Sequence, residues 1–146
     1  MYFSPWTDLS ALGDARGLER LALFDNPVLL SLAGAQLPER LELLALQDNP
    51  VLANLDGLET LRSIDRLSIS TVNEPFREPV ESQLTSVEGL SALERVVELS
   101  VYGQTRLRSL TGLGALREIE RLEFRTMRRS RAWQDSRAWS AWAVSS

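Results

Sequence analysis

Residues 41–64 read LELLALQDNPVLANLDGLETLRSI, and the spacing of their leucines decides the fold. Leu44 and Leu46 are two residues apart, which is the period of a strand with one buried face. The later leucines of the stretch are Leu52, Leu55, Leu58 and Leu61. They follow one another at intervals of three, which is typical of a tight helical or turn-like return. A unit that changes from period 2 to period 3 cannot bury its apolar side alone, so the stretch predicts stacking on copies of itself.

Copies of this unit run through most of the chain. The run LALFDNPVL at 21–29 matches LALQDNPVL at 44–52 almost letter for letter. The strand leucines recur every 23 residues, except in one unit that is nine residues longer, and they are Leu21, Leu44, Leu67, Leu99 and Leu122. We therefore expect strands near 20–24, 43–47, 66–70 and 121–125, with another around Leu99.

The pattern resembles the leucine-rich repeats, whose core is L-x-x-L-x-L-x-x-N-x-x-L. The segments LANLDGLETLRSIDRLSIS (52–70) and LRSLTGLGALREIERLEFR (107–125) are similar to the receptor L-domain variety. The resemblance covers roughly residues 9–126 and is to repeats of the bacterial type. It implies an α/β, strand-dominated, right-handed solenoid of about five coils of 23 residues. Such a solenoid has one parallel sheet and short helical or turn-like returns, and the resemblance does not name a partner.

The repeat grid divides the chain into two parts. Residues 1–126 form the expected solenoid, in which 1–16 are a half-repeat without strand leucines. We expect the aromatic side chains there to cover the end of the first coil, because a solenoid end exposes an apolar cross-section. They are Tyr2, Phe3 and Trp6, and a membrane-anchoring patch is the alternative. Residues 127–146 are rich in arginine and tryptophan and form either a C-terminal cap or a disordered tail.

Two local features break or mark the repeat. The enlarged unit places a loop at 73–83 that contains Pro75, Phe76, Arg77 and Pro79. Prolines and charges around one aromatic predict an exposed, partly stiffened loop. Asn26, Asn49 and Gln104 occupy one repeat position, where a side-chain amide can bond backbone groups that are left free as each strand ends. Glycines also recur at one position of the return (57, 89 and 112), where we expect them to serve a turn.

The composition argues against catalysis. The chain has no cysteine, no histidine and no lysine, which removes the usual nucleophiles, bases and metal ligands. Ser68 and Ser100 therefore have no activating partner. Asp25 and Asp48 stack in neighbouring units, where two carboxylates could hold a cation or do acid–base work. Both belong to a repeated Asp-Asn-Pro turn, which favours a structural role, so we expect no enzyme activity, no metal and no cofactor.

Charge and hydropathy restrict the partners. The net charge of −4 argues against a general nucleic-acid binder. Five of the sixteen arginines nevertheless fall within 125–137 beside Trp133, a combination that suits a single-stranded nucleic acid or an anionic surface. No 18-residue apolar run is present, so no membrane span is expected. The N-terminal residues do not resemble a secretory signal, which predicts a cytoplasmic protein, or an extracellular one if the true start lies upstream.

Alternation along each strand predicts which side chains lie on the open face of the sheet. The first row is Arg20, Leu43, Arg66, Glu98 and Arg121. The second is Ala22, Ala45, Ser68, Ser100 and Glu123. The third is Phe24, Gln47, Ser70, Tyr102 and Arg125. The fourth is Asp25, Asp48, Thr71, Gly103 and Thr126.

The second row is a floor of small residues until Glu123, with aromatics on one side and arginines on the other. This layout is typical of an interface hot spot, so we expect a protein partner on this face and on the 73–83 loop. The expected contact residues are Phe24, Gln47, Arg66, Ser68, Phe76, Arg77, Ser100, Tyr102 and Arg121. Self-association of a structural repeat module is the competing hypothesis, and nucleic-acid contact through the C-terminal segment is a distant third.

Overall fold

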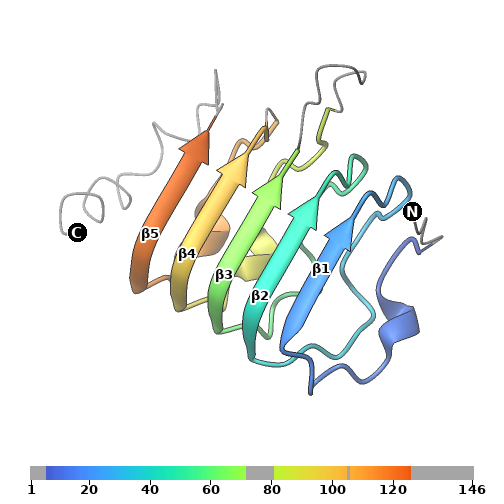
Figure 1. The fold of residues 1–146 in the computed structure, drawn as a ribbon, viewed down its shortest axis with the longest axis horizontal. Helices are drawn as coiled ribbons and strands as arrows, with labels where there is room; N and C mark the ends of the chain where they lie inside the picture. The colour runs from blue at the N-terminus through green and yellow to red at the C-terminus, as the bar shows by residue number, and fades with distance from the viewer. Residues whose placement is uncertain (1–5, 72–80, 105, 126–146) are drawn as a thin grey trace.

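The computed structural model describes residues 6–71, 81–104 and 106–125, which include every strand. The chain forms one five-stranded sheet in the order β1-β2-β3-β4-β5, and all neighbours are parallel (Figure 1). The strands are β1 (Arg20–Phe24), β2 (Arg40–Gln47), β3 (Ser63–Ser70), β4 (Arg95–Tyr102) and β5 (Glu118–Arg125). Each returning segment leads to the next strand in the chain, so the molecule is a β-solenoid of about four turns. The count is about four rather than five, because five strands need only four returning segments to join them.

The register confirms the sequence repeat. Leu21 lies opposite Leu44, Leu44 opposite Leu67, and Leu67 opposite Leu99, which in turn lies opposite Leu122. The nine extra residues of the third unit leave this register unchanged. They are therefore confined to the connection between β3 and β4.

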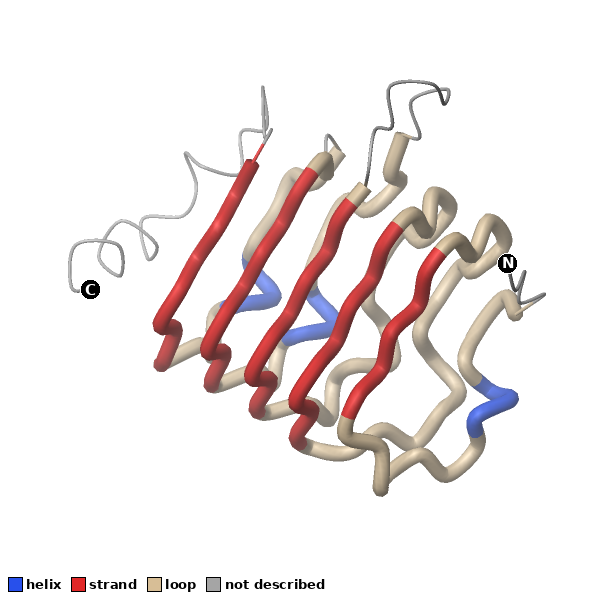
Figure 2. The backbone as a smooth tube through the Cα atoms, viewed as in Figure 1, coloured by secondary structure: helices blue, strands red, loops and turns tan. Residues whose placement is uncertain are grey.

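Strands β2, β3 and β5 begin three residues earlier than the sequence pattern predicts. Leu41 and Leu44 are both buried although they are three residues apart, and Ile64 and Leu67 repeat the arrangement. Strict alternation would place such a pair on opposite faces, so each strand must bend between them (Figure 2). Neighbouring coils stay bonded at this corner, where the Glu42 N–H donates to the Glu19 carbonyl at 2.8 Å.

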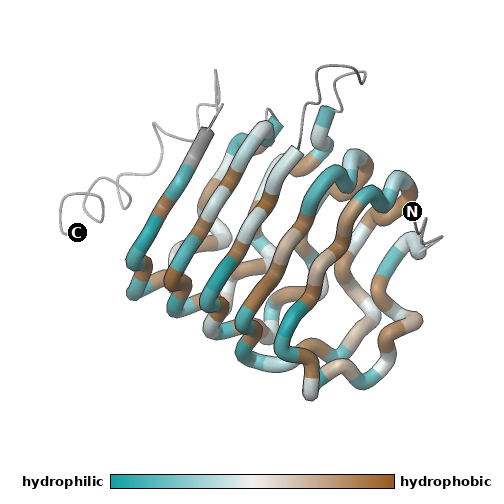
Figure 3. Tube along the Cα trace, in the orientation of Figure 1, coloured by the Kyte–Doolittle hydropathy of each residue, from teal (hydrophilic) through white to brown (hydrophobic). Residues whose placement is uncertain are grey.

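The core is a continuous stack of aliphatic side chains between the sheet and the returns. Hydrophobic residues recur along both the strands and the returns (Figure 3). The leucines of the period-3 stretch, Leu52, Leu55, Leu58 and Leu61, are all buried in it. Burial of one such side chain contributes about 2 kcal/mol. The returns of the later coils are short 3₁₀ turns, η2 (Glu88–Leu90) and η3 (Thr111–Leu113).

The recurring glycines allow adjacent coils to approach closely. A Cβ at Gly89 would lie 1.8 Å from the Leu55 carbonyl oxygen, and one at Gly112 would lie 2.0 Å from the Val87 carbonyl oxygen. At Gly57 the corresponding distance, to the Leu32 carbonyl oxygen, is 2.3 Å. Of these three, only Gly57 has a positive φ. The expected role in a turn therefore holds for Gly57 alone, and close backbone contact explains the position as a whole.

The half-repeat before β1 closes the N-terminal end of the core. It contains η1 (Ser10–Leu12), and its Leu9 is fully buried with its N–H bonded to the Ala33 carbonyl at 2.9 Å. Trp6 is more than one-third exposed, and Tyr2 and Phe3 lie outside the described residues. Within residues 6–71, Leu9 is a fully buried side chain of the half-repeat at this end of the core.

An exposed ion pair in this half-repeat gives a pH prediction. The Arg16 guanidinium donates to Asp14 at 2.9 and 2.7 Å, and with the Arg16 backbone N–H it lowers the pKa of Asp14 to about 2. A depressed folded-state pKa adds stability that is present above the unfolded-state pKa and is lost as the pH falls through about 2. An NMR titration should therefore place the Asp14 midpoint near 2, and Arg16→Gln should raise it toward 3.8. An unchanged midpoint in Arg16→Gln would contradict this cause.

Candidate functional site

The open face of the sheet carries the first three predicted rows. Arg20, Leu43, Arg66, Glu98 and Arg121 are successive Cα partners, and so are the members of the second and third rows. Neighbouring members of a row lie about 4.8 Å apart, as in any sheet. The period-2 prediction of this face is therefore confirmed.

The N-terminal half of this face presents an exposed aromatic beside small side chains. Phe24, at the end of β1, is 51% exposed. Ala22 is exposed, and Ala45 and Ser68 are half-buried in the same row of the sheet. Gln47 follows Phe24 in the third row, and its Nε2 donates to Asp48 at 3.2 Å. A flat floor with one protruding ring is suited to contact with another protein surface.

In the C-terminal half of the face, the second row is partly covered. The Tyr102 hydroxyl donates to the Glu123 carboxylate of the next strand. Ser100 is the Cα partner of Glu123 and is only 8% exposed. Ser100, one of the expected contact residues, is therefore buried in the chain by itself.

Charged side chains line the first row and its flank. The Arg66 Nε lies 3.3 Å from Glu98, and the Arg20 Nε lies 3.1 Å from Glu42. Both arginine side chains remain about two-thirds exposed or more, and Arg121 is also exposed. Exposed ion pairs contribute only about 0–1 kcal/mol, so such an arginine can exchange its carboxylate for one on a partner at little cost.

The fourth predicted row does not continue along the open face. Asp25 and Asp48 adopt the left-handed backbone conformation, with φ of 53° at each, in the repeated turn that ends β1 and β2. At the same point after β3, Thr71 is buried and its Oγ1 accepts a hydrogen bond from Gln104 Nε2 at 3.0 Å. Within the described ranges, no group of three or more His, Asp or Glu side chains could hold a metal ion.

A ladder of buried amides runs beneath these turns. Asn49 Oδ1 accepts from the Asn26 N–H at 3.2 Å and from Asn26 Nδ2 at 2.9 Å. Asn49 Nδ2 donates to the Leu23 carbonyl at 2.9 Å. The expected role of this repeat position in bonding free backbone groups is confirmed, and the later coils use different residues for it.

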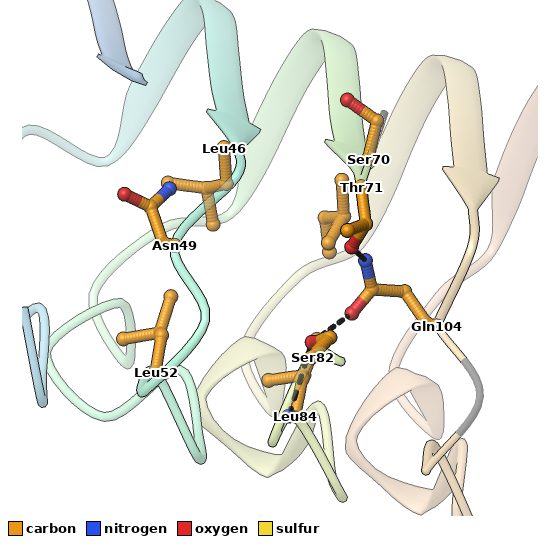
Figure 4. A pocket seen from close by; sticks show the side chains of 9 residues that line it. Leu46, Asn49, Leu52, Ser70, Thr71, Ser82, Leu84 and Gln104 are labelled. Atoms are coloured by element: carbon orange, nitrogen blue, oxygen red, sulfur yellow. Dashed lines mark hydrogen bonds between the residues drawn. The ribbon is translucent and has the colours of Figure 1, made fainter. Parts of the chain in front are cut away.

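In the fourth coil Gln104 takes the amide position, and its partner in the preceding coil is Ser82. The Ser82 hydroxyl donates to Gln104 Oε1 at 2.6 Å (Figure 4). Gln104 Nε2 also donates to the Tyr102 carbonyl at 3.1 Å. Ser82 was expected in an exposed loop but is buried. The long connection therefore rejoins the core at Ser82, where its hydroxyl meets the Gln104 amide.

A small cavity lies beside this pair, between the second and fourth coils. Asn49, Thr71, Ser82 and Gln104 provide its polar lining, and Leu46 and Leu84 are among its apolar lining residues. It has room for about one water molecule, so it is a packing defect of the ladder and not a substrate pocket.

Two exposed apolar residues of the first coil were not predicted from the sequence. Val28 and Leu30 are 43% and 58% exposed, and the Leu30 N–H bonds the Thr7 carbonyl at 2.8 Å. The second unit has Ala53 at the repeat position of Leu30, which indicates that this position does not need a large core side chain. With Trp6 and Phe24, they are the exposed large hydrophobic residues among those described.

The remaining expected contact residues are Phe76 and Arg77, which lie outside the described residues. No helix in the described part of the chain is long and apolar enough to span a membrane. Comparison with protein-family models, with curated proteins and with solved structures found no match to this chain.

Proposed function

We propose that this chain is a non-enzymatic recognition module of the leucine-rich-repeat type, which binds a protein partner through the open face of its sheet. The observation that supports it is Phe24, a half-exposed ring at the edge of a floor formed by Ala22, Ala45 and Ser68. A soluble fold gains nothing from an exposed aromatic at this place, whereas a buried aromatic anchor is a common source of binding energy at interfaces.

The surroundings of Phe24 indicate what kind of surface would fit. Small side chains let a partner backbone or a flat side chain approach the sheet closely. Arg66 offers donors for a carboxylate, and Gln47 offers an amide. The partner surface thus combines an apolar group for Phe24 with an acidic group across the floor, and Phe76 and Arg77 of the 73–83 loop add to the contact.

Self-association is the second candidate function. It is favoured by the exposed apolar side chains near the N-terminal end of the solenoid, namely Trp6 in the half-repeat and Phe24, Val28 and Leu30 in the first coil. A second copy could cover them, since exposed apolar patches mark interaction sites. Sedimentation at several concentrations separates the two candidates, because self-association depends on protein concentration without any added partner.

The recognition hypothesis is tested by affinity capture from the source cells with two matched variants. Phe24→Ser removes the anchor on the open face. Leu30→Ser removes an equally exposed apolar side chain that follows the turn after β1. We expect Phe24→Ser to weaken binding of a discrete partner by about 30-fold, the size of a hot-spot loss of about 2 kcal/mol. Leu30→Ser should leave that partner bound.

Equal loss from both variants would indicate that the apolar first coil, and not the open face, makes the contact. The same protein captured by the parent chain and by Phe24→Ser would contradict the proposal.

A further inference from the structure

Strand β1 forms an open edge of the sheet. It stands first in the strand order, so within the described residues only β2 pairs with it (Figure 1). Just past the end of β1, the Asp25 N–H donates to the Gln47 carbonyl of β2 at 3.1 Å. Successive residues of a strand direct their backbone groups to opposite sides, so the odd-numbered residues of β1 face β2. The N–H and C=O groups of Arg20, Ala22 and Phe24 therefore face the open edge.

The exposure of these three residues agrees with an open edge. Arg20, Ala22 and Phe24 are all exposed, whereas the next two members of the Ala22 row, Ala45 and Ser68, are half-buried. An edge strand of this kind presents a row of backbone donors and acceptors that can pair with another extended chain.

The layer of returns extends one coil further than the layer of strands at this end. In the half-repeat, the Leu9 N–H donates to the Ala33 carbonyl and the Ala15 N–H to the Gln36 carbonyl, each at 2.9 Å. Residues 6–19 thus add a return to the first coil, and they contain no strand of their own (Figure 2). A whole coil of a second copy would meet this half-repeat, whereas a single extended segment needs only the edge of β1.

The pairs inside the sheet indicate which side chains suit a segment at this edge. Glu98 is the Cα partner of Arg66, and its carboxylate lies 3.3 Å from the Arg66 Nε. Arg20 belongs to the same row and its side chain is 71% exposed, so an acidic residue beside it gives a matching pair. Leu21 and Leu23 point to the core, which favours apolar residues beside them, and the small second row favours a small residue in between.

We propose that the open edge of β1 binds an extended segment of a partner protein, which adds one further strand parallel to β1. Five successive positions of the segment are acidic, apolar, small, apolar and aromatic, the last lying beside the exposed ring of Phe24. In strand addition, main-chain hydrogen bonds provide affinity and alternating side chains provide specificity. The inference does not depend on recognition through the open face, because its hydrogen bonds come from the backbone edge.

The chain itself supplies a probe with this pattern, since residues 98–102 read ELSVY. A labelled synthetic peptide of residues 95–104, RVVELSVYGQ, is titrated with the full-length protein in a fluorescence anisotropy assay. We expect saturable binding that Ala22→Pro weakens about tenfold, because it removes one outward N–H. Proline is tolerated on an edge strand where the N–H faces outward. Ala22→Thr keeps that N–H and should bind as the parent does, and absence of saturable binding would overturn the proposal.

Modified peptides repeat the test without changing the protein. In a parallel strand, the peptide residues beside Leu21 and Leu23 direct their N–H groups to β1. N-methylation of the peptide at Leu99 and Val101 should therefore abolish binding, whereas N-methylation at Ser100 should leave it within about twofold. Equal weakening by both modifications, or the opposite order, would overturn the proposed pairing.

Hydrogen exchange tests the edge itself. In the protein alone, the Ala22 amide should exchange at least tenfold faster than the amides of Leu21 and Leu23, and the peptide should slow it. An Ala22 amide that is already protected in the protein alone would show that the edge is covered and would overturn the proposal.

Discussion

Replacing Gly89 by alanine is expected to lower the free energy of unfolding by about 3 kcal/mol or more, the upper part of the range for overpacking a core. The new Cβ would lie 1.8 Å from the carbonyl oxygen and 2.3 Å from the carbonyl carbon of Leu55 in the preceding coil. Backbone atoms cannot rotate away as a side chain can, so the two coils would have to separate. Thermal unfolding should show a fall in Tm of about 10 °C for a chain of this size.

Gly17→Ala is the matched control for this substitution. A Cβ at Gly17 would have no atom within 4 Å, and the residue does not have a left-handed φ. Its Tm should stay within the change expected for an ordinary surface substitution, about 0.5 kcal/mol in stability. Equal values of Tm for Gly89→Ala and the parent chain would show that the coils are not as closely stacked as described.

Asn49→Ala is expected to lower the free energy of unfolding by about 3 kcal/mol. It removes a buried amide that hydrogen-bonds two backbone groups of the first coil. The substitution leaves the Asn26 N–H and the Leu23 carbonyl without their 3.2 and 2.9 Å partners. Each buried group left unsatisfied costs about 1–3 kcal/mol, whereas the loss of one exposed hydrogen bond costs about 1 kcal/mol or less. Denaturant unfolding of the variant measures the difference.

Asn54→Ala provides the comparison, since the Asn54 side chain accepts one exposed hydrogen bond from the Asp56 N–H at 3.2 Å. It should cost less than about 1 kcal/mol. A similar loss of stability in both variants would mean that the buried amide bonds of Asn49 add little to stability. The repeated Asn would then serve only the conformation of the turn.

The strand-face prediction succeeded where the residue spacing alone decides the geometry. Alternation from Leu44 to Leu46, repeated every 23 residues except across the one enlarged unit, is sufficient to give the rows and their partners. The same reasoning placed the strand starts too late. Leu41 and Leu44 are three residues apart, a spacing that belongs to a return unless the strand bends at a corner.

Side-chain exposure was harder to predict, because it depends on neighbours in other coils. Ser100 belongs to a correctly predicted row but is covered where Tyr102 bonds Glu123. Thr71 follows β3 as Asp48 follows β2, yet it is turned inward by its bond to Gln104. Both outcomes require knowing which long side chains meet across coils, and the repeat pattern of one coil does not contain that information.

The central claim, recognition through the open face, is tested most directly by hydroxyl-radical footprinting of the protein alone and in complex with its captured partner. The account predicts protection of Phe24 on the open face, with Leu30 reacting equally in both states. Protection of Leu30 while Phe24 stays reactive would place the contact away from the sheet and would contradict the account.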